Sequence, residues 1–218
     1  MAVELKFCGL TRGADAAFAA SLGASYVGVI FAESPRRVDP TLAATILATA
    51  RGRARAVGVF GKAGIESVAA VAAEAALDVV QLHGDPSPGM VERVRPFFGG
   101  EVWAVVRIAG SELPPHVTAL LTVADAVVLD TKVSGQLGGT GTSFDWSAVA
   151  RVLDRQRVRA RIVLAGGLTP DNVADAVRAV APDIVDVSSG VESAPGIKDH
   201  ARMRAFRDAV RRPGESRE

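Results

Sequence analysis

VELKFC, at residues 3–8, is the first of eight short runs rich in β-branched and apolar residues. The other seven are SYVGVI (25–30), AVGVF (56–60), DVVQLH (78–83), VWAVVRI (102–108), DAVVLD (125–130), RIVLAG (161–166) and DIVDVS (183–188). Stretches rich in alanine and leucine with helical spacing separate them, for example DPTLAATILATARG at 39–52. Eight alternating strands and helices predict a parallel sheet closed into a (β/α)8 TIM barrel, an α/β fold.

A doubly wound open sheet is the main alternative fold. It usually has fewer strands, and no G-x-G-x-x-G motif opens the first predicted helix. We therefore expect a single barrel domain over residues 1–210 and a polar, frayed tail over 211–218. Thr169 and Asp39, each followed by proline, are the expected N-caps of two helices.

Composition excludes several classes of protein. Hydrophobic residues make up 49% of the 218-residue chain, which argues against disorder, and 25 basic against 24 acidic side chains leave a net charge of +1. Such a balance does not indicate a nucleic-acid or anionic-membrane partner. The single cysteine excludes an internal disulfide and a cysteine-based zinc site, and the three histidines are scattered. No signal peptide or membrane span is evident, so we expect a cytoplasmic protein. Because the histidines are scattered and there is one cysteine, we expect no metal site.

Polar residues end several of the predicted strands. Side chains alternate between the faces of a strand, so Leu5 and Phe7 should pack against helices while Lys6 and Cys8 face into the barrel. The same alternation places further polar side chains on the inward faces of later strands, namely Gln81, His83, Asp130, Asp186 and Ser188. A lone histidine or a terminal aspartate is often only structural. Polar groups at the inner ends of four strands are costly to bury unless a ligand uses them, and active sites of this fold lie there.

Two glycine-rich turns follow the last two strands, AGGLTPDNV at 165–173 and VSSGVES at 187–193. Glycines allow backbone N–H groups to approach an anion, and the loops after strands seven and eight are the recurrent phosphate position of this fold. The alternative is that these glycines serve only tight turns. Two such turns together favour a sugar phosphate or a similar ligand. We predict that the phosphate is bound by Gly166, Gly167, Ser188, Ser189 and Gly190.

Two further loops are candidates for contact with a ligand. The glycine run GQLGGTGTSFDW at 135–146, which includes Gly139 and Gly141, is either a lid over the ligand or a long surface loop. The loop FAESPRRVDP at 31–40 carries Arg36 and Arg37, and an arginine at the mouth of a barrel can fork onto a carboxylate.

Eight motifs in order resemble one family. They are K-x-C-G-L-T (6–11), S-P-R-x-V (34–38), V-G-V-F (57–60), V-Q-L-H-G (80–84), L-D-T (129–131), G-G-T-G-x-x-F-D-W (138–146), A-G-G-L-x-P-x-N-V (165–173) and D-V-S-S-G-V-E-x-x-P-G-x-K-D (186–199). Together they run nearly the whole chain and resemble phosphoribosylanthranilate isomerase of tryptophan biosynthesis. The resemblance implies an Amadori rearrangement of an N-(5-phosphoribosyl)anthranilate aminoaldose to a 1-deoxyribulose aminoketose, without a cofactor.

The resemblance also implies residue roles. Cys8 matches the general base that takes the proton from ribose C2, and Asp130 matches the general acid that protonates the ring oxygen. Arg36, with Arg37 as the alternative, matches the arginine that binds the anthranilate carboxylate. Remaining substrate contacts are expected from Lys6, Gln81, His83, Gly139, Gly141 and Asp186. The phosphosugar substrate is the only partner expected, and we expect a monomer, with a dimer as the alternative.

The proposed acid and base place demands on their surroundings. A free thiol has a pKa of about 8.5, so Cys8 needs a nearby positive charge, for which Lys6 is the candidate. Asp130 must hold a proton, so burial or a negative neighbour would have to raise its pKa. Rival functions are another sugar-phosphate barrel enzyme (an epimerase or a lyase-type synthase), a non-catalytic sensor, and a dual-substrate isomerase that also serves histidine synthesis. The pairing of Cys8 with Asp130 argues against each.

Overall fold

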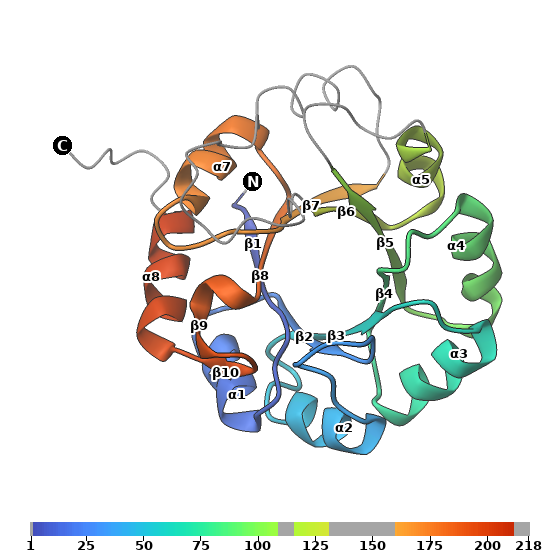
Figure 1. Cartoon of the computed structure of the whole chain (residues 1–218), viewed down its shortest axis with the longest axis horizontal. Coiled ribbons are helices and arrows are strands. Elements are labelled where there is room, and N and C mark those ends of the chain that lie inside the picture. Colours follow the sequence, from blue (N-terminus) through green and yellow to red (C-terminus); the bar gives the residue numbers. More distant parts are fainter. Residues whose placement is uncertain (1, 109–115, 131–159, 212–218) are drawn as a thin grey trace.

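A computed structural model describes residues 2–108, 116–130 and 160–211. Eight parallel strands form a closed barrel in sequence order, which confirms the predicted fold (Figure 1). The strands are β1 (Glu4–Phe7), β2 (Tyr26–Ile30), β3 (Arg55–Phe60), β4 (Val79–Leu82), β5 (Glu101–Arg107), β6 (Ala126–Asp130), β7 (Arg161–Ala165) and β8 (Ile184–Val187). β8 pairs with β1, with Lys6 opposite Asp186, and this pairing closes the ring.

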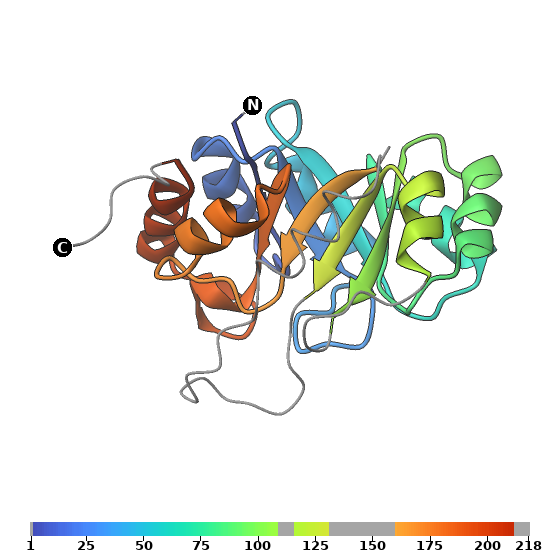
Figure 2. The same ribbon diagram turned by 90° about the horizontal axis from the view of Figure 1, so that it is seen from above.

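Helices surround the barrel on its outer face, as the side view also shows (Figure 2). The described helices are α1 (Gly13–Ser21), α2 (Pro40–Ala48), α3 (Ile65–Glu74), α4 (Pro88–Val94), α5 (Val117–Val123), α7 (Val173–Val180) and α8 (His200–Arg211), with a 3₁₀ turn at Arg95–Phe97. The predicted helix after β6 and residues 212–218 of the predicted tail lie outside the described residues. No helix in the described ranges is long and apolar enough to cross a membrane.

The alternation predicted along the strands is observed in the two apolar clusters of the core. The larger cluster, which includes Leu5 and Phe7, packs between strands and helices. The smaller cluster fills the barrel and includes Trp103, Val128 and Ile184. Because both sides of the sheet are covered, inward-facing polar side chains at the strand ends have little access to water.

One of the two predicted helix caps is confirmed. Asp39 caps α2, since Leu42 N donates to Asp39 Oδ1 at 2.8 Å, and Pro40 is the first helical residue. The prediction of Thr169 as an N-cap is wrong, because α7 begins only at Val173. The Asn172 side chain accepts from Thr169 N at 2.8 Å and donates to Gly167 O at 3.0 Å. These bonds hold 169–172 in a turn and delay the helix.

A short hairpin after β8 was not expected from the sequence. It follows a 3₁₀ turn at Ser189–Val191 and consists of β9 (Glu192–Ala194) and β10 (Ile197–Lys198), which pair antiparallel. The hairpin leads directly into α8 and brings the buried Glu192 and Lys198 next to the carboxyl end of the barrel.

Candidate active site

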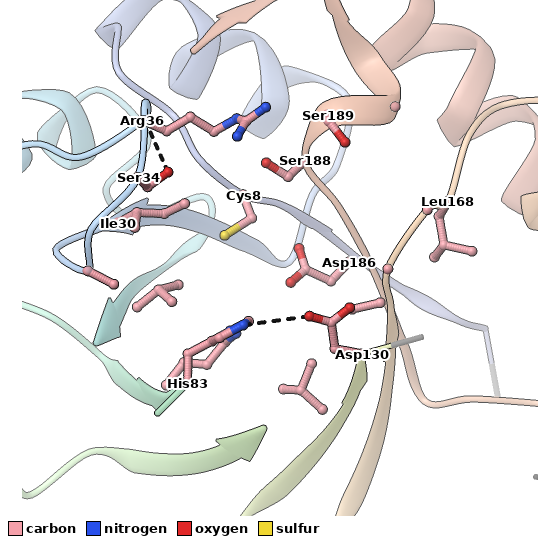
Figure 3. Close-up of a pocket in the computed structure, with 18 of the residues that line it drawn as sticks. Cys8, Ile30, Ser34, Arg36, His83, Asp130, Leu168, Asp186, Ser188 and Ser189 are labelled. Carbon is pink, nitrogen blue, oxygen red and sulfur yellow. Dashed lines mark hydrogen bonds and ion pairs between the residues drawn. The ribbon is translucent and has the colours of Figure 1, made fainter. Parts of the chain in front are cut away.

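A cavity of about 330 Å³ lies at the carboxyl ends of the barrel strands (Figure 3). Cys8 reaches it from the end of β1, Asp130 from the end of β6 and Asp186 from β8. Its other polar lining side chains include Ser34, Arg36, Gln81, His83, Ser188 and Ser189. Residues predicted from six different segments of the chain are therefore brought together in one place.

Lys6 and Asp186 form an ion pair at the base of this site. Lys6 is fully buried, and its Nζ lies 2.5 Å from Asp186 Oδ2. Burial alone would lower the pKa of Lys6, but the carboxylate of Asp186 and the neighbouring Cys8 outweigh it and raise this pKa. Lys6 is thus held as a cation below the cavity, whereas Asp186 is among the residues that line it.

Cys8 is 6% exposed and interacts with both members of this pair. Its backbone N donates to Val187 O at 2.9 Å, which fixes the end of β1 against β8. Gly28 makes room for the thiol, since a Cβ there would lie 2.9 Å from Sγ. Burial raises the pKa of Cys8; Lys6 opposes this effect and Asp186 adds to it. Lys6 does favour the thiolate, as expected from the sequence, but it does not outweigh burial, so the free site holds a thiol at neutral pH.

His83 and Asp130 face each other across the cavity, with His83 Nε2 3.6 Å from Asp130 Oδ2. Burial lowers the pKa of His83, against the opposing effect of Asp130, so the imidazole is neutral near pH 7. Among the described residues, three buried side-chain atoms have no hydrogen-bond partner: Gln81 Oε1, His83 Nδ1 and Asp186 Oδ1. Unsatisfied polar atoms gathered at one cavity indicate that a polar ligand completes them.

The two glycine-rich turns meet at one side of the cavity, as predicted for a phosphate site. Gly166 and Gly167 have φ angles of 88° and 64°, which few other residues adopt. Gly190 packs against the other turn so closely that a Cβ would lie 1.9 Å from Leu168 O. Backbone groups from both turns, with Ser188 and Ser189, therefore line a common wall.

The structure separates the two candidate arginines. Arg36 lines the cavity, whereas Arg37 forms a β-bridge with Ile30 and lines a neighbouring groove. Arg36 Nε and Nη2 donate to Glu192 at 2.7 and 2.6 Å, and its backbone N donates to Ser34 Oγ at 3.1 Å. Gly9 permits this placement, because a Cβ there would lie 2.6 Å from Arg36 Cδ.

Some of the predictions are not covered by this geometry. Gly139, Gly141 and the candidate lid at 135–146 lie outside the described residues. Conversely, the sequence-based site omits Glu192 and Lys198, which contact each other and Arg36 or the Ser188 carbonyl. Their only signal was membership in the motif at 186–199. Within the described ranges, no group of three or more His, Cys, Asp or Glu side chains could hold a metal ion.

Comparison with known proteins decides the family. The family model of N-(5'-phosphoribosyl)anthranilate isomerase matches residues 5–209. The chain belongs to this family. Among relatives, the isomerase of Pseudomonas fluorescens Pf-5 is 42% identical over 217 residues, covering 99% of both chains. The isomerase of Magnetococcus marinus is also 42% identical, over 214 residues and 97% of both chains. The chain is therefore an isomerase of tryptophan biosynthesis.

Solved structures agree with this assignment. The isomerase of Thermotoga maritima superposes with a TM-score of 0.83 at 34% identity, covering 95% of this chain and 98% of the other. A further isomerase structure, with a TM-score of 0.81 and 33% identity, covers the same shares and contains reduced 1-(o-carboxyphenylamino)-1-deoxyribulose 5-phosphate. Members of the family thus share the closed barrel described above.

Proposed function

We propose that the chain converts N-(5'-phosphoribosyl)anthranilate to 1-(2-carboxyphenylamino)-1-deoxyribulose 5-phosphate, with Cys8 as general base and Asp130 as general acid. One observation carries the proposal: Cys8 and Asp130 line the same cavity, which also contains the glycine turns and Arg36. A proton donor, a proton acceptor and two candidate anion sites match the needs of a substrate with a phosphate at one end and a carboxylate at the other.

Two side chains of the protein each make one proton transfer in this reaction. Asp130 gives its proton to the ring oxygen as the C1–O bond breaks, and the nitrogen lone pair forms a C1=N iminium. Cys8, after its thiol has lost its proton to solvent, removes the C2 proton as the thiolate, and the electron pair of that bond neutralises the iminium to give an enolamine. The C2 hydroxyl then loses its proton and C1 gains one, which gives the ketone. The transient iminium cation favours the thiolate nearby, and so does Lys6, although burial is the larger effect on the pKa of Cys8 in the free site.

Binding follows from the polar groups that line the cavity. The backbone of 166–167 and 188–190 offers N–H groups to the phosphate. The guanidinium of Arg36 is placed to receive the carboxylate. Gln81, His83 and Asp186 line this cavity and would contact ribose hydroxyls; each also has one buried side-chain atom without a hydrogen-bond partner among the described residues. The family member cited above binds a compound with the same two charged ends, which supports this orientation.

The test is isomerase activity on freshly generated substrate, followed as loss of its fluorescence. We expect Cys8→Ser and Asp130→Asn each to lower kcat by about 10²–10⁴-fold, because each removes one proton-transfer group. Asp175→Asn, an exposed aspartate on α7, is the matched control and should retain full activity. A Cys8→Ser variant as fast as wild type would exclude the thiol as base, and an inactive wild type that still binds the phosphosugar would favour a sensor.

The remaining expectations stay predictions. These are the single domain over 1–210, the cytoplasmic location, the absence of a cofactor, and the monomer with a dimer as the alternative. A dimeric form is described for the isomerase of Thermotoga maritima. Sedimentation of the purified chain would decide between the two states.

A further inference from the structure

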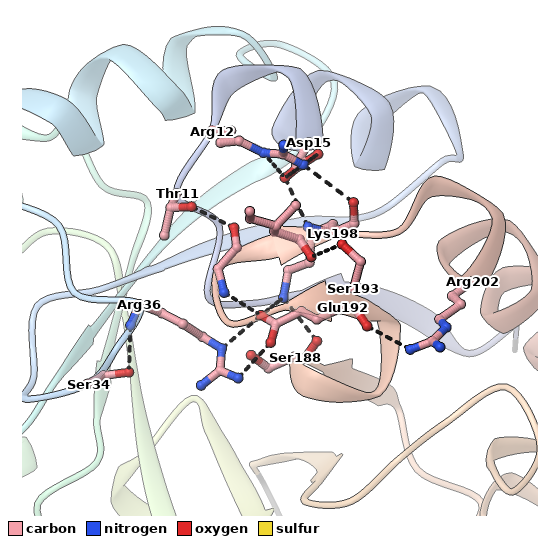
Figure 4. Close-up of polar contacts among 12 residues, drawn as sticks. Thr11, Arg12, Asp15, Ser34, Arg36, Ser188, Glu192, Ser193, Lys198 and Arg202 are labelled. Carbon is pink, nitrogen blue, oxygen red and sulfur yellow. Dashed lines mark hydrogen bonds and ion pairs between the residues drawn. The ribbon is translucent and has the colours of Figure 1, made fainter.

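A buried charged cluster lies behind the part of the cavity wall that Arg36 lines, where the hairpin β9–β10 meets the loop that carries Arg36 (Figure 4). Its members are Arg36, Glu192 and Lys198. The side chains of Glu192 and Lys198 are only 5% and 0% exposed. Neither is one of the residues that line the cavity, so their effect on a ligand must pass through a neighbour.

Glu192 holds one specific edge of the Arg36 guanidinium. Its Oε2 accepts from Arg36 Nη2, and its Oε1 accepts from Arg36 Nε, from Lys198 Nζ at 2.9 Å and from Gly196 N at 3.3 Å. No hydrogen bond joins Arg36 Nη1 to any residue that the structure describes, and Figure 4 shows this nitrogen turned away from Glu192. A bidentate pair fixes the plane of a guanidinium, so the edge left over has a defined direction.

The charges of the cluster do not cancel. Two cations, Arg36 and Lys198, contact the one carboxylate of Glu192, and burial lowers the pKa of Lys198. Burial would raise the pKa of Glu192, but Arg36 and Lys198 outweigh it and lower this pKa, so Glu192 is ionised at neutral pH. A buried, uncompensated cation is costly unless an anion completes the set. An anionic group of a ligand at the free edge of Arg36 would offset the second cation of the cluster.

Lys198 also connects this cluster to the phosphate side. Its Nζ donates to Ser188 O at 3.0 Å, at the start of the turn that lines the phosphate wall. The ammonium thus fixes both Glu192 and the backbone after β8. The strand-end patterns of the sequence do not predict this hairpin. Through Lys198 and Glu192 it fixes the position of Arg36 relative to the turn that begins at Ser188.

We propose that Glu192, anchored by Lys198, is a positioning residue that orients Arg36 so that its free edge selects ligands with an aromatic carboxylate. This rests on the proposed function, in which Arg36 binds the anthranilate carboxylate. Glu192 acts through Arg36 and does not touch the substrate. A merely structural role for the hairpin would instead affect every ligand of the cavity alike.

The test compares two probes that differ in one group. One is reduced 1-(o-carboxyphenylamino)-1-deoxyribulose 5-phosphate, and the other is the same compound without the ring carboxyl. Titration calorimetry on the full chain gives the affinity of each probe for wild type and for Glu192→Gln. We expect Glu192→Gln to weaken binding of the carboxylate probe by roughly tenfold or more, and to change binding of the other by less than about twofold.

Two further variants make the test specific. Glu101→Gln removes a carboxylate that also binds two arginines, but at the opposite end of the barrel, and should change neither affinity. Arg36→Met should abolish the preference for the carboxylate probe, and adding Glu192→Gln to it should cost nothing more, because both changes act on one contact. Should Glu192→Gln fail to fold, Glu192→Asp retracts the carboxylate while keeping the charge, and we expect a smaller loss confined to the same probe.

The outcomes separate this inference from the proposed function. Wild type that binds neither probe and turns over no substrate would overturn the proposed function. Wild type that prefers the carboxylate probe, with a Glu192→Gln variant that keeps this preference, would overturn only the positioning role. Equal weakening of both probes in Glu192→Gln would show that the hairpin is structural and would also overturn it.

Discussion

The two ends of the barrel treat polar side chains in opposite ways. At the end where the strands begin, Glu101 accepts from Trp103 Nε1 at 2.8 Å and from Arg161 Nη2 at 2.6 Å, and also binds Arg55. Arg161 Nη1 in turn donates to Tyr26 OH at 2.7 Å. These side chains satisfy one another without any outside group, which is the pattern expected of a stabilising network.

At the end where the strands finish, the pattern is different. Gln81 Oε1, His83 Nδ1 and Asp186 Oδ1 are buried without hydrogen-bond partners among the described residues. Burial also raises the pKa of Cys8 and lowers the pKa of His83, so it favours the neutral form of both side chains. Such groups lower the stability of the free protein, and a bound ligand supplies the hydrogen-bond partners that they lack. One end of the same sheet therefore favours folding, and the other retains the chemistry.

The largest test of this contrast removes the buried pair at the catalytic end. Lys6→Met alone should lower the free energy of unfolding by roughly 3–5 kcal/mol, because it leaves Asp186 as an unpaired buried charge. Lys6→Met combined with Asp186→Leu should recover most of that loss or exceed the stability of wild type, while isomerase activity is lost. Urea unfolding of wild type and the two variants measures the loss of stability and its recovery, and an isomerase assay measures the loss of activity.

The contrast fails if the double variant is as unstable as the single one. The pair would then stabilise the barrel in the same way as the network at the other end. Trp103, which is fully buried and is changed in neither variant, provides a fluorescence signal for the unfolding transition.

A smaller effect is expected at the stabilising end. Glu101→Gln should lower the free energy of unfolding by about 1–3 kcal/mol and leave kcat unchanged, because it breaks charged hydrogen bonds far from the cavity. Burial would raise the pKa of Glu101, but Arg55, Trp103 and Arg161 outweigh it and lower this pKa. The stabilisation is therefore present above the unfolded-state pKa of about 4.3 and is lost as pH falls through the lower folded value.

Thermal or urea unfolding at several pH values checks this prediction. The difference between wild type and Glu101→Gln should shrink as pH falls below about 4. A difference that is constant down to the lowest pH would mean that Glu101 acts by packing and not by its charge.

The sequence predicts features set by local patterns better than features set by contacts between distant segments. Alternation along the strands is enough to place Leu5 outside, Lys6 inside and Asp130 at the mouth, because strand geometry has a strict period of two. The glycine turns are equally predictable, since the fold itself places the loops after β7 and β8 together. Local periodicity therefore accounts for the barrel and for most of the cavity wall.

The features that were missed depend on contacts between distant segments. Glu192 and Arg36 are 156 residues apart, and no local pattern indicates that they form a bidentate pair. The start of α7 was misplaced because the Asn172 side chain binds Gly167 O, a bond that competes with capping by Thr169. The sequence predicts that Lys6 governs the pKa of Cys8, but it does not show how deeply the thiol is buried or that Asp186 pairs with Lys6, and both effects raise this pKa.

The smallest predicted effect concerns this thiol and needs no substrate. Cys8 is the only cysteine, so the rate of its alkylation by iodoacetamide reports on one group. Burial raises its pKa, so alkylation should be slower than that of a model thiol at pH 7–8 and should keep rising above about pH 8.5, since only the thiolate reacts. Asp186→Asn should shift the midpoint to lower pH, because it removes a negative charge that disfavours the thiolate, and Lys6→Met should shift it to higher pH, because it removes the cation that favours it. Midpoints that move in the opposite directions, or a wild-type midpoint below that of a model thiol, would show that Cys8 is already poised as a thiolate and that the catalytic end is less strained than the comparison of the two ends implies.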